Sequence, residues 1–177
     1  MDYIEYDIYQ LKIPAIVCLY TIGGIDSNEL EKVSEYMLNL GADSQYLVDI
    51  LLSQDLTSDE LTAIFEKAIN DLGYVIPSET EAAISLSKKI AMEILSGAKT
   101  PYQGAMFIWK NIINHIDDIP DDLWLFKSYA SAIEDILSHV KNYVAVGDAS
   151  DYDKLIQTSE QEILKAAKKL CDTTKSD

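Results

Sequence analysis

The fold is decided by residues 78–116, SETEAAISLSKKIAMEILSGAKTPYQGAMFIWKNIINHI, in which the start and the end of two successive helices can be read. Ser78 and Glu81 have the spacing of a reciprocal capping box at a helix N-terminus. Gly97 suits the left-handed position after a last helical turn, and Pro101 suits the first turn of a new helix. The stretch therefore predicts two helices joined by a short turn.

Each of these helices carries apolar residues at the spacing of one helix face. Such a stripe must be buried, and two amphipathic helices joined by a few residues pack as an antiparallel hairpin. We therefore predict a central antiparallel helical hairpin over residues 78–116. The stripes are Ala83, Leu86, Ile90, Ala91, Ile94 and Leu95, then Ala105, Ile108, Trp109, Ile112, Ile113 and Ile116.

Helix signals also precede the hairpin. Asp26 with Glu29 and Thr57 with Glu60 are two further capping pairs, each followed by an amphipathic pattern. The segment between them, residues 43–53, is apolar on more than one side, which predicts a short central helix.

The first residues are harder to interpret. Residues 2–22 fit both a helix and an aromatic strand, and we favour helix. Within them, Pro14 begins a short buried helix that ends at Gly23.

Towards the C-terminus, Pro120 followed by Asp121 marks the start of another helix, because the first turn of a helix favours proline and negative charge. Residues 142–151 form a connection, and a last helix runs from about residue 152 to 170. Its pattern predicts that Leu155 is buried, while residues 171–177 form a frayed tail.

The composition agrees with these patterns. The chain has 177 residues, 48% of them hydrophobic, with only 7 glycines and 4 prolines. Such a chain is long enough for one domain with a substantial core. We predict an all-α fold, a single-domain bundle of about seven helices spanning residues 1–177.

The charge is strongly negative and uneven. The chain has 30 acidic residues, 14 lysines and no arginine, giving a net charge of -16. This composition argues against nucleic-acid binding and favours a basic partner, although net negative charge also serves solubility alone. Residues 1–87 contain 16 acids against three lysines, a balance of -13, whereas residues 88–177 have a balance of -3.

No catalytic or metal-binding motif is present in the sequence. The two histidines, His115 and His139, lack the Glu-x-x-His pairs of di-iron sites and the HEXXH pattern of zinc sites, and no GxSxG elbow or phosphate-binding loop occurs. Neither Cys18 nor Cys171 belongs to a CxxC motif. The apolar run 13–25 is too short to span a bilayer. We therefore expect no enzyme, no cofactor, no membrane insertion and a reduced, cytoplasmic protein.

Aromatic residues are the remaining candidates for function, because tyrosine and tryptophan dominate binding hot spots. Trp109 lies on a core stripe and is expected to be structural. Tyr102, Phe107, Trp124 and Tyr129 fall at the edges of their stripes, so they form either exposed anchors or a second packed layer.

The runs IAMEILSGAKTPYQGAMFIW (90–109) and IPDDLWLFKSYASAIED (119–135) carry a resemblance. They resemble small helical bacterial proteins with the pattern IL-x-G-x(3)-P-x-x-GA-x-x-IW, which are largely uncharacterised and some of which are suspected toxin-immunity proteins. The match covers about a quarter of the chain and transfers no catalytic residue. It implies a helical, non-enzymatic protein.

Charge, missing catalytic motifs and this resemblance together favour an immunity-type inhibitor of a basic toxin, for example a nuclease. Carboxylates would take the place of nucleic-acid phosphates on the partner. The alternative is a helical adaptor or homodimeric scaffold, and an enzyme of unrecognised type is a third hypothesis. The predicted partner-binding residues are Glu29, Glu31, Glu35, Asp43, Asp49, Asp55, Asp59 and Glu60.

Overall fold

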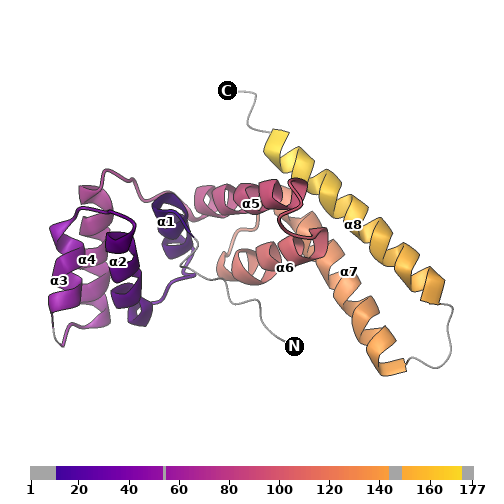
Figure 1. Ribbon diagram of the computed structural model, residues 1–177, viewed down its shortest axis with the longest axis horizontal. Coiled ribbons are helices and arrows are strands. Elements are labelled where there is room, and N and C mark those ends of the chain that lie inside the picture. The colour runs from indigo at the N-terminus through magenta and orange to yellow at the C-terminus, as the bar shows by residue number, and fades with distance from the viewer. Residues whose placement is uncertain (1–10, 54, 144–148, 173–177) are drawn as a thin grey trace. The chain divides into compact units, whose positions relative to one another are not determined.

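The computed structural model describes residues 11–53, 55–143 and 149–172, and within them the protein is all-helical (Figure 1). The all-α prediction is confirmed, with eight α-helices and two 3-10 turns in the described residues in place of about seven helices. Our interpretation of residues 2–10 as helical lies outside the described residues.

The chain divides into two compact units, Met1–Ala83 and Ile84–Asp177, which we call the N-terminal unit and the C-terminal unit. Each is described by itself below. The single-domain organisation that we expected stays a prediction.

The N-terminal unit is built from α1 (Ile13–Thr21), α2 (Leu30–Asn39), α3 (Gln45–Leu52) and α4 (Ser58–Asp71). α2 packs against α3 and α4, and α3 packs against α4. Tyr20 connects α1 to α4, because its ring meets Phe65 edge-on at 5.1 Å between centroids and its hydroxyl donates to Glu66 at 3.0 Å. The core includes the large side chains of Ile16, Leu30, Met37, Leu47, Ile50, Phe65 and Ile69.

Local capping sets the start of these helices. The predicted capping boxes are confirmed at Asp26 with Glu29, which opens the 3-10 turn Ser27–Glu29 before α2, and at Thr57 with Glu60, which opens α4. The Thr57 amide donates to the Glu60 carboxylate at 2.9 Å, and the Glu60 amide donates to the Thr57 hydroxyl at 3.3 Å. The short helix expected after Pro14 is also confirmed as α1.

The predicted central helix, α3, is buried on one side only. Leu47 and Ile50 are buried against the neighbouring helices, but Leu52 is 76% exposed and Tyr46 is 38% exposed. An eight-residue helix that packs against α2 and α4 on one side leaves its opposite side in solvent. The predicted short helix is therefore present between α2 and α4 in the chain and packs against both, but its apolar residues are not all buried.

The predicted hairpin is formed by α5 (Glu79–Leu95) and α6 (Pro101–Asn111). Ser78 and Glu81 make the expected reciprocal bonds, and Gly97 has a φ of 78° after the last turn of α5. The two helices approach so closely that a Cβ atom on Gly104 of α6 would lie 3.4 Å from Cγ2 of Ile90. The hairpin therefore packs closely at Gly104, the glycine of the GA pair in the quoted pattern.

The second helix of the hairpin ends earlier than predicted. α6 ends at Asn111, and residues Ile113–His115 form a 3-10 turn after Ile112 leaves the helical region with φ -121° and ψ -62°. Ile112, Ile113 and Ile116 are all buried nevertheless. Apolar spacing predicts which side chains are buried here, and it does not detect the break in the backbone.

The C-terminal unit is completed by α7 (Asp121–Tyr143) and α8 (Ala149–Asp172), which pack along each other and against α6 (Figure 1). α8 begins three residues before the predicted start and includes Cys171 and Asp172, where we expected a frayed tail. The Cys171 thiol lies 4.0 Å from the Lys88 carbonyl of α5, so this last turn packs against the hairpin. Residues 144–148 and 173–177 lie outside the described residues.

Leu95 and Leu155, which the sequence predicted to be buried, are exposed, and so is Leu137. Leu95 is the last residue of α5, Leu137 lies on α7 and Leu155 lies near the start of α8. Helical apolar spacing alone therefore does not ensure burial, and the prediction of burial fails at Leu95 and Leu155.

Candidate protein-binding surface

The boundary between the two units is also the boundary of the uneven charge. The N-terminal unit contains 16 acidic residues and three lysines, a balance of -13, and the C-terminal unit contains 14 acidic residues and 11 lysines, a balance of -3. The excess negative charge therefore belongs to one compact part of the molecule.

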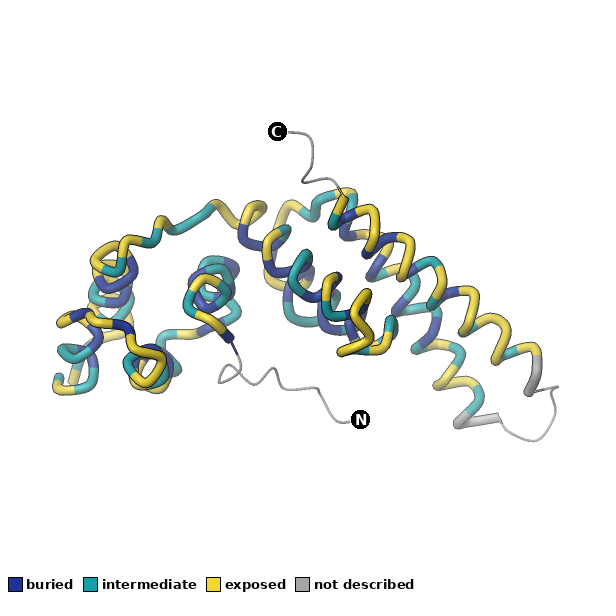
Figure 2. Tube along the Cα trace, turned by 45° about the horizontal axis from the view of Figure 1, so that its top comes forward, coloured by how far each residue is buried: buried dark blue, intermediate teal, exposed yellow. Residues whose placement is uncertain are grey.

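All eight carboxylates that the sequence predicted as partner-binding lie in the N-terminal unit, and the structure distributes them over several elements. Six are exposed and two, Glu29 and Asp49, are half-buried. Exposed and buried residues alternate along the helices of this unit (Figure 2). The eight do not form one cluster. Glu29 lies in the 3-10 turn, Glu31 and Glu35 one turn apart on α2, Asp43 before α3, Asp49 on α3, Asp55 between α3 and α4, and Asp59 and Glu60 in the first turn of α4.

None of the described carboxylates of the N-terminal unit forms an ion pair. Its described lysines, Lys12, Lys32 and Lys67, are all exposed. Ion pairs between described side chains occur instead in the C-terminal unit, where lysines meet carboxylates at 2.6 to 3.8 Å. The negative field of the N-terminal unit is therefore not neutralised from within that unit, in the part of it that the structure describes.

Some of the predicted residues have a structural role. Glu29 and Glu60 accept the amide hydrogen bonds of their capping boxes. The backbone amide and then the hydroxyl of Thr57 lower the pKa of Glu60. Asp49 accepts a hydrogen bond of 2.9 Å from the side-chain amide of Gln45. The carboxylates least involved in such bonds are those on α2 and around the ends of α3.

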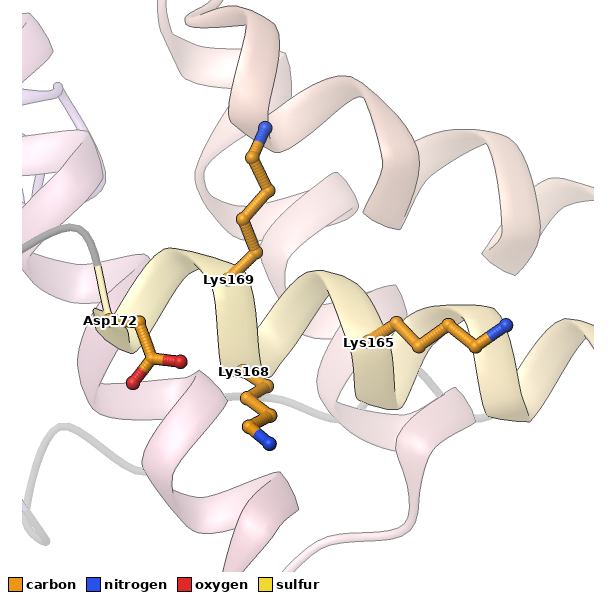
Figure 3. Close-up of a pocket in the computed structure, with 4 residues that line it drawn as sticks. All are labelled: Lys165, Lys168, Lys169 and Asp172. Carbon is orange, nitrogen blue, oxygen red and sulfur yellow. The ribbon is translucent and has the colours of Figure 1, made fainter.

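The lysines of α8 do not form a matching basic site. Lys165, Lys168 and Lys169 line a shallow open depression with Asp172, and their side chains point away from one another (Figure 3). Lys165 donates to Glu162 at 2.6 Å and Lys169 donates to Asp122 of α7 at 2.7 Å. These bonds raise the pKa of both lysines and neutralise their charge locally.

The structure separates the aromatic residues whose role the sequence left open. Phe107 is buried, and Tyr102 and Tyr129 are half-buried. Trp124 is 42% exposed, beside the exposed Leu125 on α7, and the Lys127 ammonium lies 4.9 Å from its ring centroid. Trp124 is therefore the one exposed anchor among the four.

Two further properties concern the described residues. No group of three or more histidine, cysteine, aspartate or glutamate side chains is arranged there to hold a metal ion. No helix among them has the length and apolar character needed to cross a bilayer.

Comparison of the chain with family models, curated proteins and solved structures found no match.

Proposed function

We propose that this chain is a non-enzymatic protein-binding module that inhibits a basic protein, in the manner of an immunity protein against a basic toxin such as a nuclease. One observation carries the proposal. The N-terminal unit has a charge balance of -13, and none of its described carboxylates is used in an ion pair.

Unpaired exposed carboxylates can act at two stages of binding. At long range, the field of one compact unit attracts a basic surface and raises its association rate by about 10- to 1000-fold at low salt. At short range, carboxylates can occupy the positions that phosphates take on a nucleic-acid-binding protein, so the partner's active face is blocked.

The experiment begins with capture. The immobilised chain is exposed to lysate of its own host at low salt and eluted with a salt step, and the recovered basic protein is purified. Association and dissociation rates are then measured at several salt concentrations. We expect the logarithm of the association rate to fall steeply with salt, because a Debye length of about 10 Å at 0.1 M screens the attraction.

A matched pair of triple variants localises the effect. In the first, Glu31→Gln, Glu35→Gln and Asp59→Asn remove three exposed charges from the N-terminal unit. In the control, Asp117→Asn, Asp118→Asn and Asp153→Asn remove three exposed charges from the C-terminal unit.

We expect the first variant to associate about tenfold more slowly at low salt and the control to match the wild type within about twofold. Equal effects of the two variants would contradict the proposal. So would a captured partner whose own activity is unchanged by a stoichiometric amount of the chain.

A second candidate function is a homodimeric scaffold, and the exposed pair Trp124 and Leu125 favours it. Tryptophan is enriched in binding hot spots, and an apolar pair on a helix surface suits a symmetric interface. Sedimentation equilibrium separates the two functions. A dimer that persists unchanged at high salt supports the scaffold, whereas a monomer at all salt concentrations excludes it.

A further inference from the structure

The exposed side of α3 combines apolar and acidic residues. Each residue of an α-helix turns by about 100°, so Tyr46, Asp49 and Leu52 cover an arc of about 120° with Asp49 in its middle. Leu47 and Ile50, about 160° and 100° from Asp49 around the helix, are buried in the core. An apolar helix of the sequence QYLVDILL thus buries part of its apolar surface and exposes the rest.

Carboxylates surround these two exposed apolar side chains along the chain. Asp43 precedes α3, Asp49 lies between the two anchors, and Asp55 follows the helix. One carboxylate oxygen of Asp49 accepts a hydrogen bond from the side-chain amide of Gln45. None of the described lysines forms an ion pair with Asp49. Apolar side chains that anchor a contact and charged groups beside them are the usual components of a binding hot spot, and we call Asp43, Asp49 and Asp55 the rim of this surface.

The charge of this rim selects the occupant. A second copy of the chain would bring the same carboxylates to a symmetric contact, and like charges would repel. A nucleic acid or an anionic surface is disfavoured for the same reason. The complementary surface is an apolar patch rimmed by lysine or arginine.

We propose that α3 is the recognition helix of the chain, with Tyr46 and Leu52 inserted into an apolar patch of a basic protein. Asp43, Asp49 and Asp55 pair with the lysine or arginine side chains around that patch. This inference rests on the proposed function and names the element that performs it.

Two synthetic probes test the inference without knowledge of the natural partner. The first is an amphipathic helical peptide of leucine and lysine, which presents an apolar stripe between ammonium groups. The second is an oligolysine of the same charge. Binding of both to the full chain is measured by calorimetry, and the contacted residues are identified from amide chemical shifts.

The expected result is that the leucine-lysine peptide shifts the amides of α3 and that Leu52→Ala and Tyr46→Ala each weaken its binding at least about tenfold. Val75→Ala is the matched control, since Val75 is 84% exposed in the same unit but lies outside α3. It should leave binding of the peptide unchanged, and none of the three variants should alter binding of oligolysine. Thermal melts verify that the variants fold.

The outcomes separate the inference from the proposed function. If neither α3 variant weakens binding of the leucine-lysine peptide while the chain still binds oligolysine, the role of α3 as the recognition helix is contradicted. The proposal of an acidic binding surface is then unaffected. Failure of both probes to bind at low salt contradicts the acidic surface itself. Binding weakened equally by Val75→Ala shows general apolar adhesion and also overturns the role of α3.

Discussion

Replacing Gly104 with alanine tests how closely α5 and α6 pack. The added methyl would overlap Cγ1 and Cδ1 of Ile94 and lie 3.4 Å from Cγ2 of Ile90. Both isoleucines are at most 3% exposed, so neither can turn into solvent. Alanine gains about 1 kcal/mol in helix propensity over glycine, while overpacking a filled core costs about 1–3 kcal/mol. We therefore expect Gly104→Ala to destabilise the protein by about 1 kcal/mol.

Urea unfolding followed by tryptophan fluorescence measures this change. The chain has two tryptophans, Trp109 and Trp124, and both lie with Gly104 in the C-terminal unit, so the signal reports the unfolding of that unit. A stabilisation of about 1 kcal/mol, as propensity alone would give, would refute the close packing.

A double-mutant cycle identifies the contact that opposes the alanine. Ile94→Ala alone should cost about 2–5 kcal/mol, and it removes the atoms that the new methyl would overlap. In that background Gly104→Ala should be neutral or stabilising, which corresponds to a coupling of at least about 1 kcal/mol between the two sites. Additive effects would show that the cost arises elsewhere.

Two hydrogen bonds of the N-terminal unit lead to further predictions. Thr57→Ala removes the cap of α4 and should cost about 1 kcal/mol in urea unfolding followed by circular dichroism. It should also raise the pKa of Glu60 part of the way toward its ordinary value in an NMR titration, because the bond from the Thr57 hydroxyl is lost while the bond from the backbone amide, the larger cause of the lowered pKa, is kept. Since the folded-state pKa is the lower one, this contribution is present above the unfolded-state pKa and is lost as the pH falls through the folded-state value, so the difference in stability between wild type and variant should become smaller in acid, where the bond from the Glu60 amide to the Thr57 hydroxyl alone remains. Tyr20→Phe removes the bond to Glu66 and should cost about 1 kcal/mol. Burial and then Glu66 raise the pKa of Tyr20 to about 12, so its contribution is present below the unfolded-state pKa and is lost as the pH rises toward 12. Absorbance titration of the variant should lack this late tyrosine.

The starts of the helices could be predicted because capping is local. A capping box such as Ser78 with Glu81 joins atoms three residues apart, so the sequence contains all of its components. The end of α6 could not be predicted, since Ile112, Ile113 and Ile116 are buried with or without a continuous helix. The spacing of apolar residues predicts which side chains are buried, whereas tertiary packing determines the path of the backbone.

The negative charge of the candidate surface could be predicted from the sequence, but the residues that are exposed and unpaired on it could not. The imbalance between the two halves is a property of composition, and the structure shows that it coincides with the two units. The lack of ion pairs among the described residues of the N-terminal unit depends on where the lysines lie in space, which no sequence pattern records. The exposure of Leu52 and Tyr46 was missed because the sequence of α3 is apolar on more than one side, and only the packing of neighbouring helices determines which side stays exposed.

The absence of ion pairs from the described part of the N-terminal unit has a thermodynamic consequence. Its carboxylates repel one another, so added electrolyte should stabilise this unit, whereas the same electrolyte weakens the surface ion pairs of the C-terminal unit. The melting temperatures of the two halves should therefore shift in opposite directions with ionic strength. A basic protein would act on the N-terminal unit as a macromolecular counterion, and its binding would raise the stability of the unit that recognises it.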